Sequence, residues 1–416
     1  MKKVGFSKLR IAFSGFVALG ILLSPQLAPQ AGEVPSGLDG QLSKNLEFWI
    51  NVYSKYESSQ GFVHDAKYVD VIYEVLEIRP SWAKSIPRIR ASKVKWRNTL
   101  LAVHKKQDDP STFTADEKKV YDLFAKIEEP NKFLNAAHRK RMRFQLGQRD
   151  RFLEGIYESG RYIPKMEHIF KEHGLPLELT RLPFVESSFN VKARSKVGAS
   201  GIWQFMPSTG RLFMNIDDAV DERNDPMLAT EAAAKLFKLN YDSLGNWPLA
   251  VTAYNHGRIG MMRAIRKVGS ENLDEVVRGY RSRTFGFASS NFFASFLAAV
   301  EVERNAEKYF GTEVKRAEPI QILEVVLPDS VRLATLKKFL KLDGAKIKAL
   351  NPALSPAVLQ SHAFIPAGYP LRLPWDGKTD KEHLSDRFFA SYSKIPGMYK
   401  RKVKRVITSE AQASAR

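Results

Sequence analysis

Hydrophobic residues along most of this chain recur at spacings of three and four, which is the pattern of amphipathic helices. The segment LEFWINVYSKYESSQGFVHDAKYVDVIYEVLEI has this spacing with Gly61 as a break, and Thr114 with Glu117 forms a capping box for a later helix. The basic segment AAHRKRMRFQLGQRDRFLEGIYESGRY is interpreted as a helix with a solvated face. We therefore predict a helical N-terminal region over residues 40–160. Its dense aromatic residues are assigned to a helical core, with a surface that stacks on sugars as the alternative.

The following segment, residues 161–312, is also predicted to be helical. In the helix LPLELTRLPFVES, Pro183 removes one backbone hydrogen bond and should bend the helix. An irregular loop follows at GASG. Asp225 is expected to cap the next long helix, with Pro226 in its first turn and Gly245 at its end. Almost nothing here alternates with the period of a strand, so we expect a separate all-helical domain.

After Lys315 the pattern changes. The stretches PIQILEVVL and FIPAGYPLRLP are typical of strands, and SVRLATLKKFLKLDGAKIKALN between them is typical of two short helices. We predict a small β-α-α-β module over residues 316–375 and a basic, disordered tail over residues 376–416. The predicted fold class is therefore mainly α, with one small mixed module.

The N-terminus has the layout of a secretory signal. MKKVGFSKLR carries four positive side chains and no negative ones, and an apolar core of 14 residues follows it. This core is short for a helix that spans a bilayer. Neither Ala28 nor Ala31 gives a good cleavage site, so residues 1–31 are either a cleaved signal or an uncleaved membrane anchor. We expect an exported protein in the periplasm or cell envelope, with membrane association through the N-terminus left open.

Composition narrows the chemistry further. The chain has no cysteine, which excludes disulfides, thiolate metal sites and a cysteine nucleophile, and its formal net charge of +20 favours a polyanionic partner. Nucleic acid is not expected as that partner, because an exported chain rarely meets it and no nucleic-acid-binding motif is present. The eight histidines show neither HExxH nor paired-ligand spacing. We expect no metal and no other cofactor.

One carboxyl group stands out as a candidate for chemistry. Glu186 is the single acidic residue in VESSFNVKARSKVGASGIWQFMPSTG, and the next one is Asp217. It is predicted to lie at the C-terminal end of a helix beside Phe184 and Phe189, where desolvation and the helix dipole both raise a carboxyl pKa. Most glycoside hydrolysis uses two carboxylates. A single acid/base suffices if the substrate supplies its own nucleophile.

The motifs ESSFN, GASGIWQFMPSTG and AYNHG occur in an order and spacing that resemble those of the lytic murein transglycosylases of the lysozyme-like superfamily, most closely the membrane-bound type D enzymes. The resemblance covers residues 160–311 and implies a lysozyme-like catalytic domain that acts on peptidoglycan glycan strands. It implies cleavage of the β-1,4 bond between N-acetylmuramic acid and N-acetylglucosamine, with the muramic acid's C6 hydroxyl attacking to form a 1,6-anhydro ring. The C-terminal module is similar to the LysM-like segment of these enzymes, and whether it binds glycan stays open.

The resemblance also implies roles for individual residues. Glu186 corresponds to the general acid/base. By the same resemblance, Ser195 supplies a hydroxyl near the reacting centre, and the Gln204 amide and the Met206 thioether line the cleft. Tyr254 and Asn255 correspond to residues that hold the glutamate region and an N-acetyl group. The substrate-binding residues implied in this way are Ser187, Ser195, Gln204, Met206, Tyr254 and Asn255.

Two positions depart from the family pattern. His256 stands where the family usually has a small residue, and Phe292 stands where many relatives carry a tyrosine that supports the glutamate. The second change implies the loss of one supporting hydrogen bond. Two other functions stay open: a hydrolytic muramidase of goose-lysozyme type, in which water attacks, and a non-catalytic peptidoglycan-binding protein.

Overall fold

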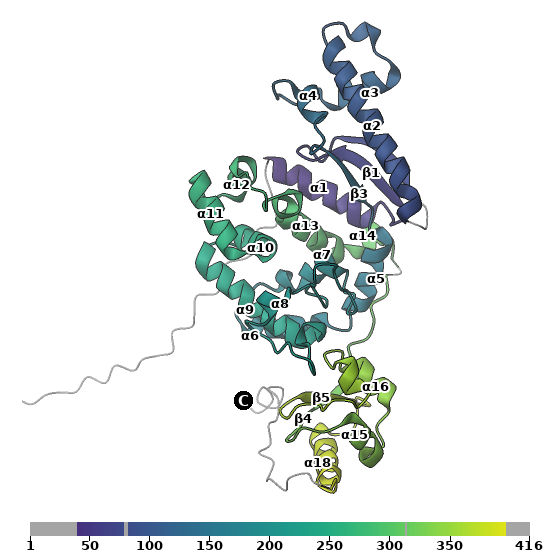
Figure 1. Ribbon diagram of the computed structural model, residues 1–416, viewed down its shortest axis with the longest axis vertical. Coiled ribbons are helices and arrows are strands. Elements are labelled where there is room, and N and C mark those ends of the chain that lie inside the picture. The colour runs from purple at the N-terminus through teal and green to yellow at the C-terminus, as the bar shows by residue number, and fades with distance from the viewer. Residues whose placement is uncertain (1–39, 79–81, 313, 397–416) are drawn as a thin grey trace, which may run out of the picture. The chain divides into compact units, whose positions relative to one another are not determined.

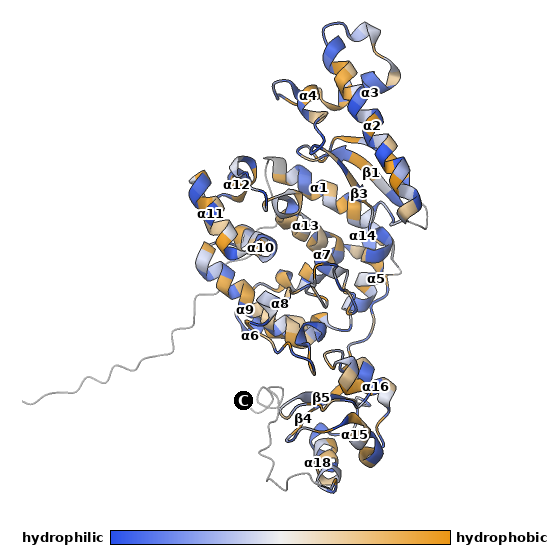
Figure 2. Ribbon diagram, in the orientation of Figure 1, coloured by the Kyte–Doolittle hydropathy of each residue, from blue (hydrophilic) through white to orange (hydrophobic). Residues whose placement is uncertain are grey.

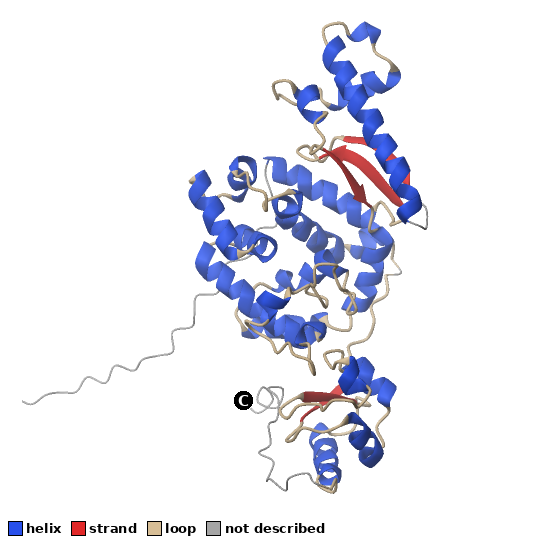
Figure 3. Cartoon of the chain, viewed as in Figure 1, coloured by secondary structure: helices blue, strands red, loops and turns tan. Residues whose placement is uncertain are grey.

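The computed structural model describes residues 40–396 of the 416-residue chain, apart from residues 79–81 and 313. Helices dominate this part of the chain, and its named strands form two small sheets (Figure 1, Figure 3). The predicted mainly α fold is confirmed. Within the described residues, no helix combines the length and the apolar character needed to cross a membrane. The predicted signal or anchor at residues 1–31 lies outside the described residues.

The N-terminal region contains an antiparallel sheet that the prediction of an all-helical region over residues 40–160 missed. Its strands lie in the order β2-β1-β3. The elements of the region are α1 (Gly40–Ser54), β1 (Gln60–Asp65), β2 (Ile72–Glu77), α2 (Trp82–Lys106), the 3-10 turn η1 (Pro110–Thr112), α3 (Ala115–Leu123), α4 (Lys132–Ala136) and β3 (Met142–Leu146). The capping box at the start of α3 is confirmed, because the Thr114 side chain accepts from the Glu117 backbone and the Glu117 side chain accepts from the Thr114 backbone.

The helical prediction failed at β1 because this strand is buried on both faces. Phe62 packs into one hydrophobic core and the adjacent Val63 into another, so the strand lacks the apolar–polar alternation that identifies a half-exposed strand. Gly61, which we expected to break a helix, lies inside β1. A Cβ at Gly61 would lie 2.2 Å from the Phe144 ring of β3, which explains the absence of a side chain there. The predicted basic helix is likewise divided, because its residues 142–146 pair with β1 as β3.

The second part of the chain is an all-helical domain, as predicted, in which apolar residues are concentrated in the interior (Figure 2). Its elements are α5 (Arg149–Ser159), α6 (Ile163–Glu172), η2 (Leu177–Arg181), α7 (Leu182–Ser187), α8 (Pro207–Gly210), η3 (Glu222–Asn224), α9 (Pro226–Leu244), α10 (Trp247–His256), α11 (Arg258–Val268), α12 (Leu273–Gly279), α13 (Phe287–Arg304) and α14 (Ala306–Phe310). Helix α13 is apolar on nearly all sides and mostly buried. Helix α1 packs along α13, so α1 belongs to the core of this domain although it precedes the sheet in the sequence.

The boundaries predicted from proline, glycine and capping residues are confirmed here. The Asp225 side chain accepts hydrogen bonds from two backbone amides of the first turn of α9, and Gly245 ends that helix in the left-handed conformation. The helix predicted around Pro183 divides into the 3-10 turn η2 and the α-helix α7, with Pro183 in the first turn of α7. This division is the bend that the proline predicted, since its missing N–H falls where a helix start needs no donor.

The C-terminal module has the predicted strands at its two ends, and they pair antiparallel with Leu323 opposite Leu373. Its elements are β4 (Ile322–Val326), α15 (Leu333–Leu340), α16 (Gly344–Leu350), the short α17 (Pro356–Leu359), β5 (Pro370–Pro374) and α18 (Lys381–Tyr392). The expectation of a disordered tail from residue 376 is wrong for α18. Phe388 and Tyr392 of this helix are buried in the core of the module, because they lie four residues apart on one face.

Candidate active site

Glu186 is the penultimate residue of α7, a short helix held between two longer ones. The chain leaves α7 at Ser188, which adopts the left-handed conformation. Just before α7, Arg181 forms ion pairs with Glu303 of α13, at 3.0 Å from its Nε, and with Glu167 of α6. These pairs are largely removed from solvent, so removing Arg181 would leave two partly buried carboxylates without their partner. The network therefore fixes the helix that carries Glu186.

The surroundings of Glu186 suit a proton donor. Its side chain is partly buried, and burial raises its pKa to about 8. The basic residues of the following loop at positions 192, 194 and 196 are exposed, and none of them offsets this rise. The carboxyl group therefore holds its proton at neutral pH, as a general acid must, while its remaining exposure leaves it open to a substrate.

The loop after α7 contains strained backbone. Ser188, Phe189 and Gln204 have φ angles of 51°, 57° and 49°, in a region that costs a non-glycine residue about 1–3 kcal/mol. Gly201 has a φ of 76°, and a Cβ there would lie 1.8 Å from the carbonyl oxygen of Arg223. Strain of this kind persists only where the surrounding packing imposes it, and it gathers at functional sites.

Three of the predicted substrate-binding residues use their side chains to hold this loop. The Ser187 hydroxyl donates to the carbonyl oxygen of Ile202 at 2.8 Å. The Ser195 hydroxyl accepts from the backbone amide of Ala199 at 2.8 Å. The Gln204 amide donates to the carbonyl three residues before it, also at 2.8 Å. These groups shape the loop beside Glu186, and their contact with a sugar stays a prediction.

Helix α10 brings two more of the predicted residues to the same place. The Tyr254 hydroxyl donates to the carbonyl oxygen of Trp203 at 2.8 Å, which ties α10 to the loop. The Asn255 side chain is exposed, and its oxygen accepts from the Ser289 hydroxyl of α13 at 2.8 Å. Trp203 is fully buried and belongs to the core, whereas Met206 is 39% exposed on the surface of the loop. Met206 is thus free to contact a ligand and Trp203 is not.

The two departures from the family pattern have clear environments. The His256 ring lies edge-on to Phe285, with 4.9 Å between the ring centroids, and burial lowers its pKa, which favours the neutral form. The Phe292 ring is buried and nearly parallel to that of Tyr254, at 6.5 Å. Phe292 thus supplies packing behind Tyr254 and no hydroxyl.

The sequence analysis missed Tyr53, which the structure brings close to Glu186 from α1. Tyr53 is 1% exposed, its ring stacks on Phe152 at 5.0 Å, and its hydroxyl forms a hydrogen bond with Ser295 of α13. Burial raises the pKa of the Tyr53 hydroxyl, and the charge of an ionised Glu186 adds to the rise. The signal in the sequence was the helical spacing of Trp49 and Tyr53, which we had assigned to a core. A phenol hydroxyl therefore does lie near the glutamate, from a different helix.

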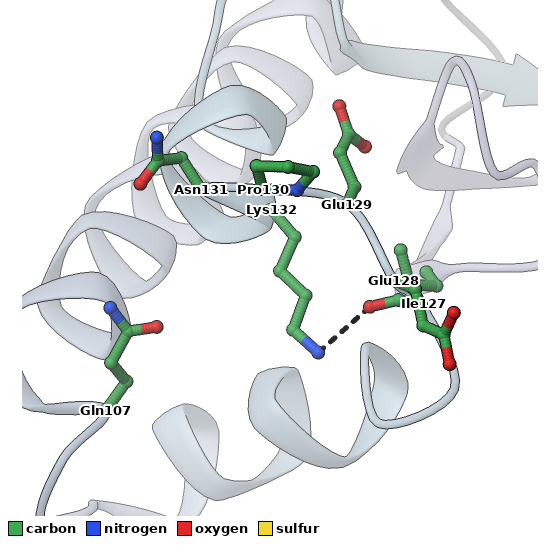
Figure 4. A pocket seen from close by; sticks show the side chains of 7 residues that line it. All are labelled: Gln107, Ile127, Glu128, Glu129, Pro130, Asn131 and Lys132. Atoms are coloured by element: carbon green, nitrogen blue, oxygen red, sulfur yellow. Dashed lines mark hydrogen bonds between the residues drawn. The ribbon is translucent and has the colours of Figure 1, made fainter.

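A pocket of about 380 Å³ lies elsewhere, between the end of α2 and the start of α4 (Figure 4). It is lined by Gln107 and residues 127–132, and Lys132 Nζ donates to the carbonyl oxygen of Ile127 at 3.1 Å. None of the predicted site residues lines it. In the part of the chain that the structure describes, no group of three or more histidine, aspartate or glutamate side chains is arranged to hold a metal ion.

Residues 167–277 match the family model named Transglycosylase SLT domain. This range contains Glu186, the strained loop and α10. The match to the Transglycosylase SLT domain family lies wholly inside the helical domain. Helix α1 with Tyr53 lies outside the matched residues of the SLT domain, so the family model alone does not include that wall of the site.

Individual proteins are similar to this chain over part of their length. Membrane-bound lytic murein transglycosylase D of Escherichia coli (strain K12) is 30% identical over 193 residues, or 45% of this chain and 42% of that protein, so the match spans less than half of the relative's length. Among solved structures, an inactive mutant of the lytic transglycosylase Slt from Pseudomonas aeruginosa is 15% identical, with a TM-score of 0.28, over 56% of this chain and 35% of that one. The 70 kDa soluble lytic transglycosylase SLT70 from Escherichia coli is 16% identical, with a TM-score of 0.26, over 66% of this chain and 38% of that one.

Proposed function

We propose that this chain is a peptidoglycan lytic transglycosylase in which Glu186 is the single general acid/base. The observation that carries the proposal is the burial of Glu186 within the SLT domain, which raises its pKa to about 8. The Escherichia coli relative is named as a lytic murein transglycosylase, which supports peptidoglycan as the substrate.

In the proposed reaction, protonated Glu186 donates its proton to the oxygen of the β-1,4 bond between N-acetylmuramic acid and N-acetylglucosamine. The bond from C1 of the muramic acid to this oxygen breaks, and the electron pair leaves with the oxygen. The C6 hydroxyl of the same muramic acid then attacks C1 and closes the 1,6-anhydro ring. Its proton passes to the Glu186 carboxylate, which restores the starting state without water.

This reaction needs one carboxyl group because the nucleophile belongs to the substrate. The absence of any other acidic residue between Glu186 and Asp217 fits that requirement. The strained loop and α10 supply the remaining contacts in the proposal. Asn255, held by Ser289, is suited to an N-acetyl group, and exposed Met206 is suited to packing on a sugar face.

Digestion of purified peptidoglycan, followed by mass spectrometry of the released fragments, tests the proposal. Lytic transglycosylation leaves 1,6-anhydro ends that are lighter by one water than the reducing ends left by a goose-type muramidase. Glu186→Gln should abolish release, whereas Glu154→Gln, which changes an exposed carboxylate on α5, should not. Reducing ends would contradict the proposed reaction. Sedimentation with peptidoglycan but no release by the wild type would indicate a binding protein instead.

We also propose that the protein acts at the cell envelope. Peptidoglycan lies outside the cytoplasmic membrane, and the Escherichia coli relative is named as membrane-bound. Fractionation of cells that express the full chain measures its location. Recovery of the protein in the cytoplasmic fraction alone would contradict this assignment.

A further inference from the structure

Two basic side chains of the N-terminal region lie near each other without an acidic partner. Arg143 on β3 and Lys93 on α2 are both partly buried, and neither forms an ion pair with another described residue. The Nε of Arg143 is buried and has no hydrogen-bond partner among the described residues. Burial lowers the pKa of each group, and the charge of Arg143 lowers that of Lys93 further. His64, which lies opposite Arg143 in the sheet, is itself buried and neutral.

Arg143 of this pair contacts α13, the helix that also holds Asn255 of the candidate active site. The Arg143 guanidinium lies over the ring of Phe287, with its Cζ 4.0 Å from the ring centroid. Phe287 is the first residue of α13, and Ser289, two residues later, is the partner of Asn255. Two residues of a helix advance it by about 3 Å. Arg143 and the predicted sugar-binding residue Asn255 therefore both contact the first turn of α13, through Phe287 and Ser289 respectively.

Two like charges that are partly removed from water raise the energy of the free protein unless an anion balances them. The planar guanidinium of arginine matches a carboxylate, which it can bind through two parallel hydrogen bonds, and a nearby lysine adds a point charge. The candidate substrate carries such carboxylates on the peptide attached to muramic acid. That peptide leaves the sugar ring at the carbon next to the one that bears the N-acetyl group.

We propose that Arg143 and Lys93 form a subsite for a carboxylate of the peptide attached to the glycan strand. The subsite makes the protein prefer glycan strands that carry acidic peptides. This inference rests on the proposed function, because it takes Asn255 as part of the glycan site. It extends the site beyond the SLT domain to the sheet of the N-terminal region.

The test compares two substrates in which the peptides are equally long. One is soluble peptidoglycan prepared by sonication, and the other is the same material with its carboxyl groups converted to neutral amides by carbodiimide and ammonia. Initial rates are measured for the full-length wild type, Arg143→Gln, Lys93→Gln and the control Arg139→Gln, which removes an exposed positive charge from the same region. Amidation should slow the wild type and Arg139→Gln by about tenfold, the value expected for loss of one charge-assisted hydrogen bond. Arg143→Gln and Lys93→Gln should be slower on native peptidoglycan and nearly insensitive to amidation.

If Arg143→Gln lowers the initial rate equally on native and amidated peptidoglycan, Arg143 has a structural role and the proposal is overturned. An Arg143→Gln protein with the same rates as Arg139→Gln would also overturn it. If Arg143→Gln does not fold, as judged by its thermal unfolding, the Lys93→Gln protein makes the same comparison. Sedimentation with insoluble native and amidated peptidoglycan, in the Glu186→Gln background, tests the subsite without catalysis. A protein that cleaves neither substrate but loses binding on amidation would refute the proposed function and keep the subsite. Equal binding to both forms would overturn the subsite.

Discussion

Replacing Glu186 with glutamine removes a carboxyl group whose ionisation the fold opposes, so the substitution should stabilise the protein at alkaline pH. Burial raises the pKa of Glu186 from its ordinary 4.5 to about 8. A rise of this size corresponds to about 5 kcal/mol of unfavourable free energy for the ionised form in the folded state. Because the side chain keeps some exposure to solvent, we expect a measured effect of about 2–3 kcal/mol.

The sign follows from the protons that each state binds. Between pH 4.5 and about pH 8, Glu186 keeps its proton in the folded protein and has lost it in the unfolded chain. The contribution of Glu186 to the free energy of unfolding is therefore fully present below pH 4.5. It is lost as the pH rises through about 8. Glutamine has nearly the same shape and does not titrate. The Glu186→Gln protein should match the wild type near pH 5 and exceed its free energy of unfolding by about 2–3 kcal/mol near pH 9.

Urea unfolding at a series of pH values, followed by tryptophan fluorescence, measures this difference. Trp203 and Trp247 are buried in the helical domain and report its transition. Tyr53 and Tyr254 do not interfere, because burial raises the pKa of both well above this range. Glu154→Gln should show no such dependence. A difference between Glu186→Gln and the wild type that stays constant from acid to alkaline pH would refute the claim that the fold keeps Glu186 protonated.

Three further predictions follow from the structure. The rate of peptidoglycan cleavage should fall as the pH rises through the pKa of Glu186, about 8, because the general acid loses its proton; a rate that still increases well above that pH would contradict the assignment. Tyr53→Phe removes a hydroxyl close to Glu186, so it should lower the rate of peptidoglycan cleavage about tenfold and the free energy of unfolding by about 1 kcal/mol. The control Tyr73→Phe changes an equally buried tyrosine in the core of the N-terminal region and should leave the cleavage rate unchanged. Arg141 forms an ion pair with the fully buried Asp65 at 2.9 Å. Arg141→Gln leaves the Asp65 carboxylate without this partner and should lower the free energy of unfolding by about 3–5 kcal/mol, as measured by urea unfolding. An unchanged urea midpoint would show that the ion pair contributes nothing to stability.

Prediction from sequence succeeded where a residue and its near neighbours in the chain decide the outcome. The capping box at Thr114, the cap at Asp225 and the bend at Pro183 depend on groups within four residues, and the structure has all three. It failed where a distant partner decides. Strand β1 exists because β2 and β3 pair with it, and α18 is ordered because the core of the module accepts Phe388.

For the candidate site too, local features were predicted from the sequence and long-range ones were not. The sequence predicted Glu186 at the C-terminal end of a helix and an irregular loop at GASG after it, whereas the strained backbone of Ser188, Phe189 and Gln204 was seen only in the structure. Its raised pKa depends on burial by side chains from several helices, and Tyr53 and Arg143 reach the start or the flank of α13 from elements more than a hundred residues away. Local sequence determines which backbone conformations have low energy. The desolvation of a side chain and the charges near it depend on which segments pack together. Only the tertiary structure could decide the proton affinity of this carboxyl group and its neighbours.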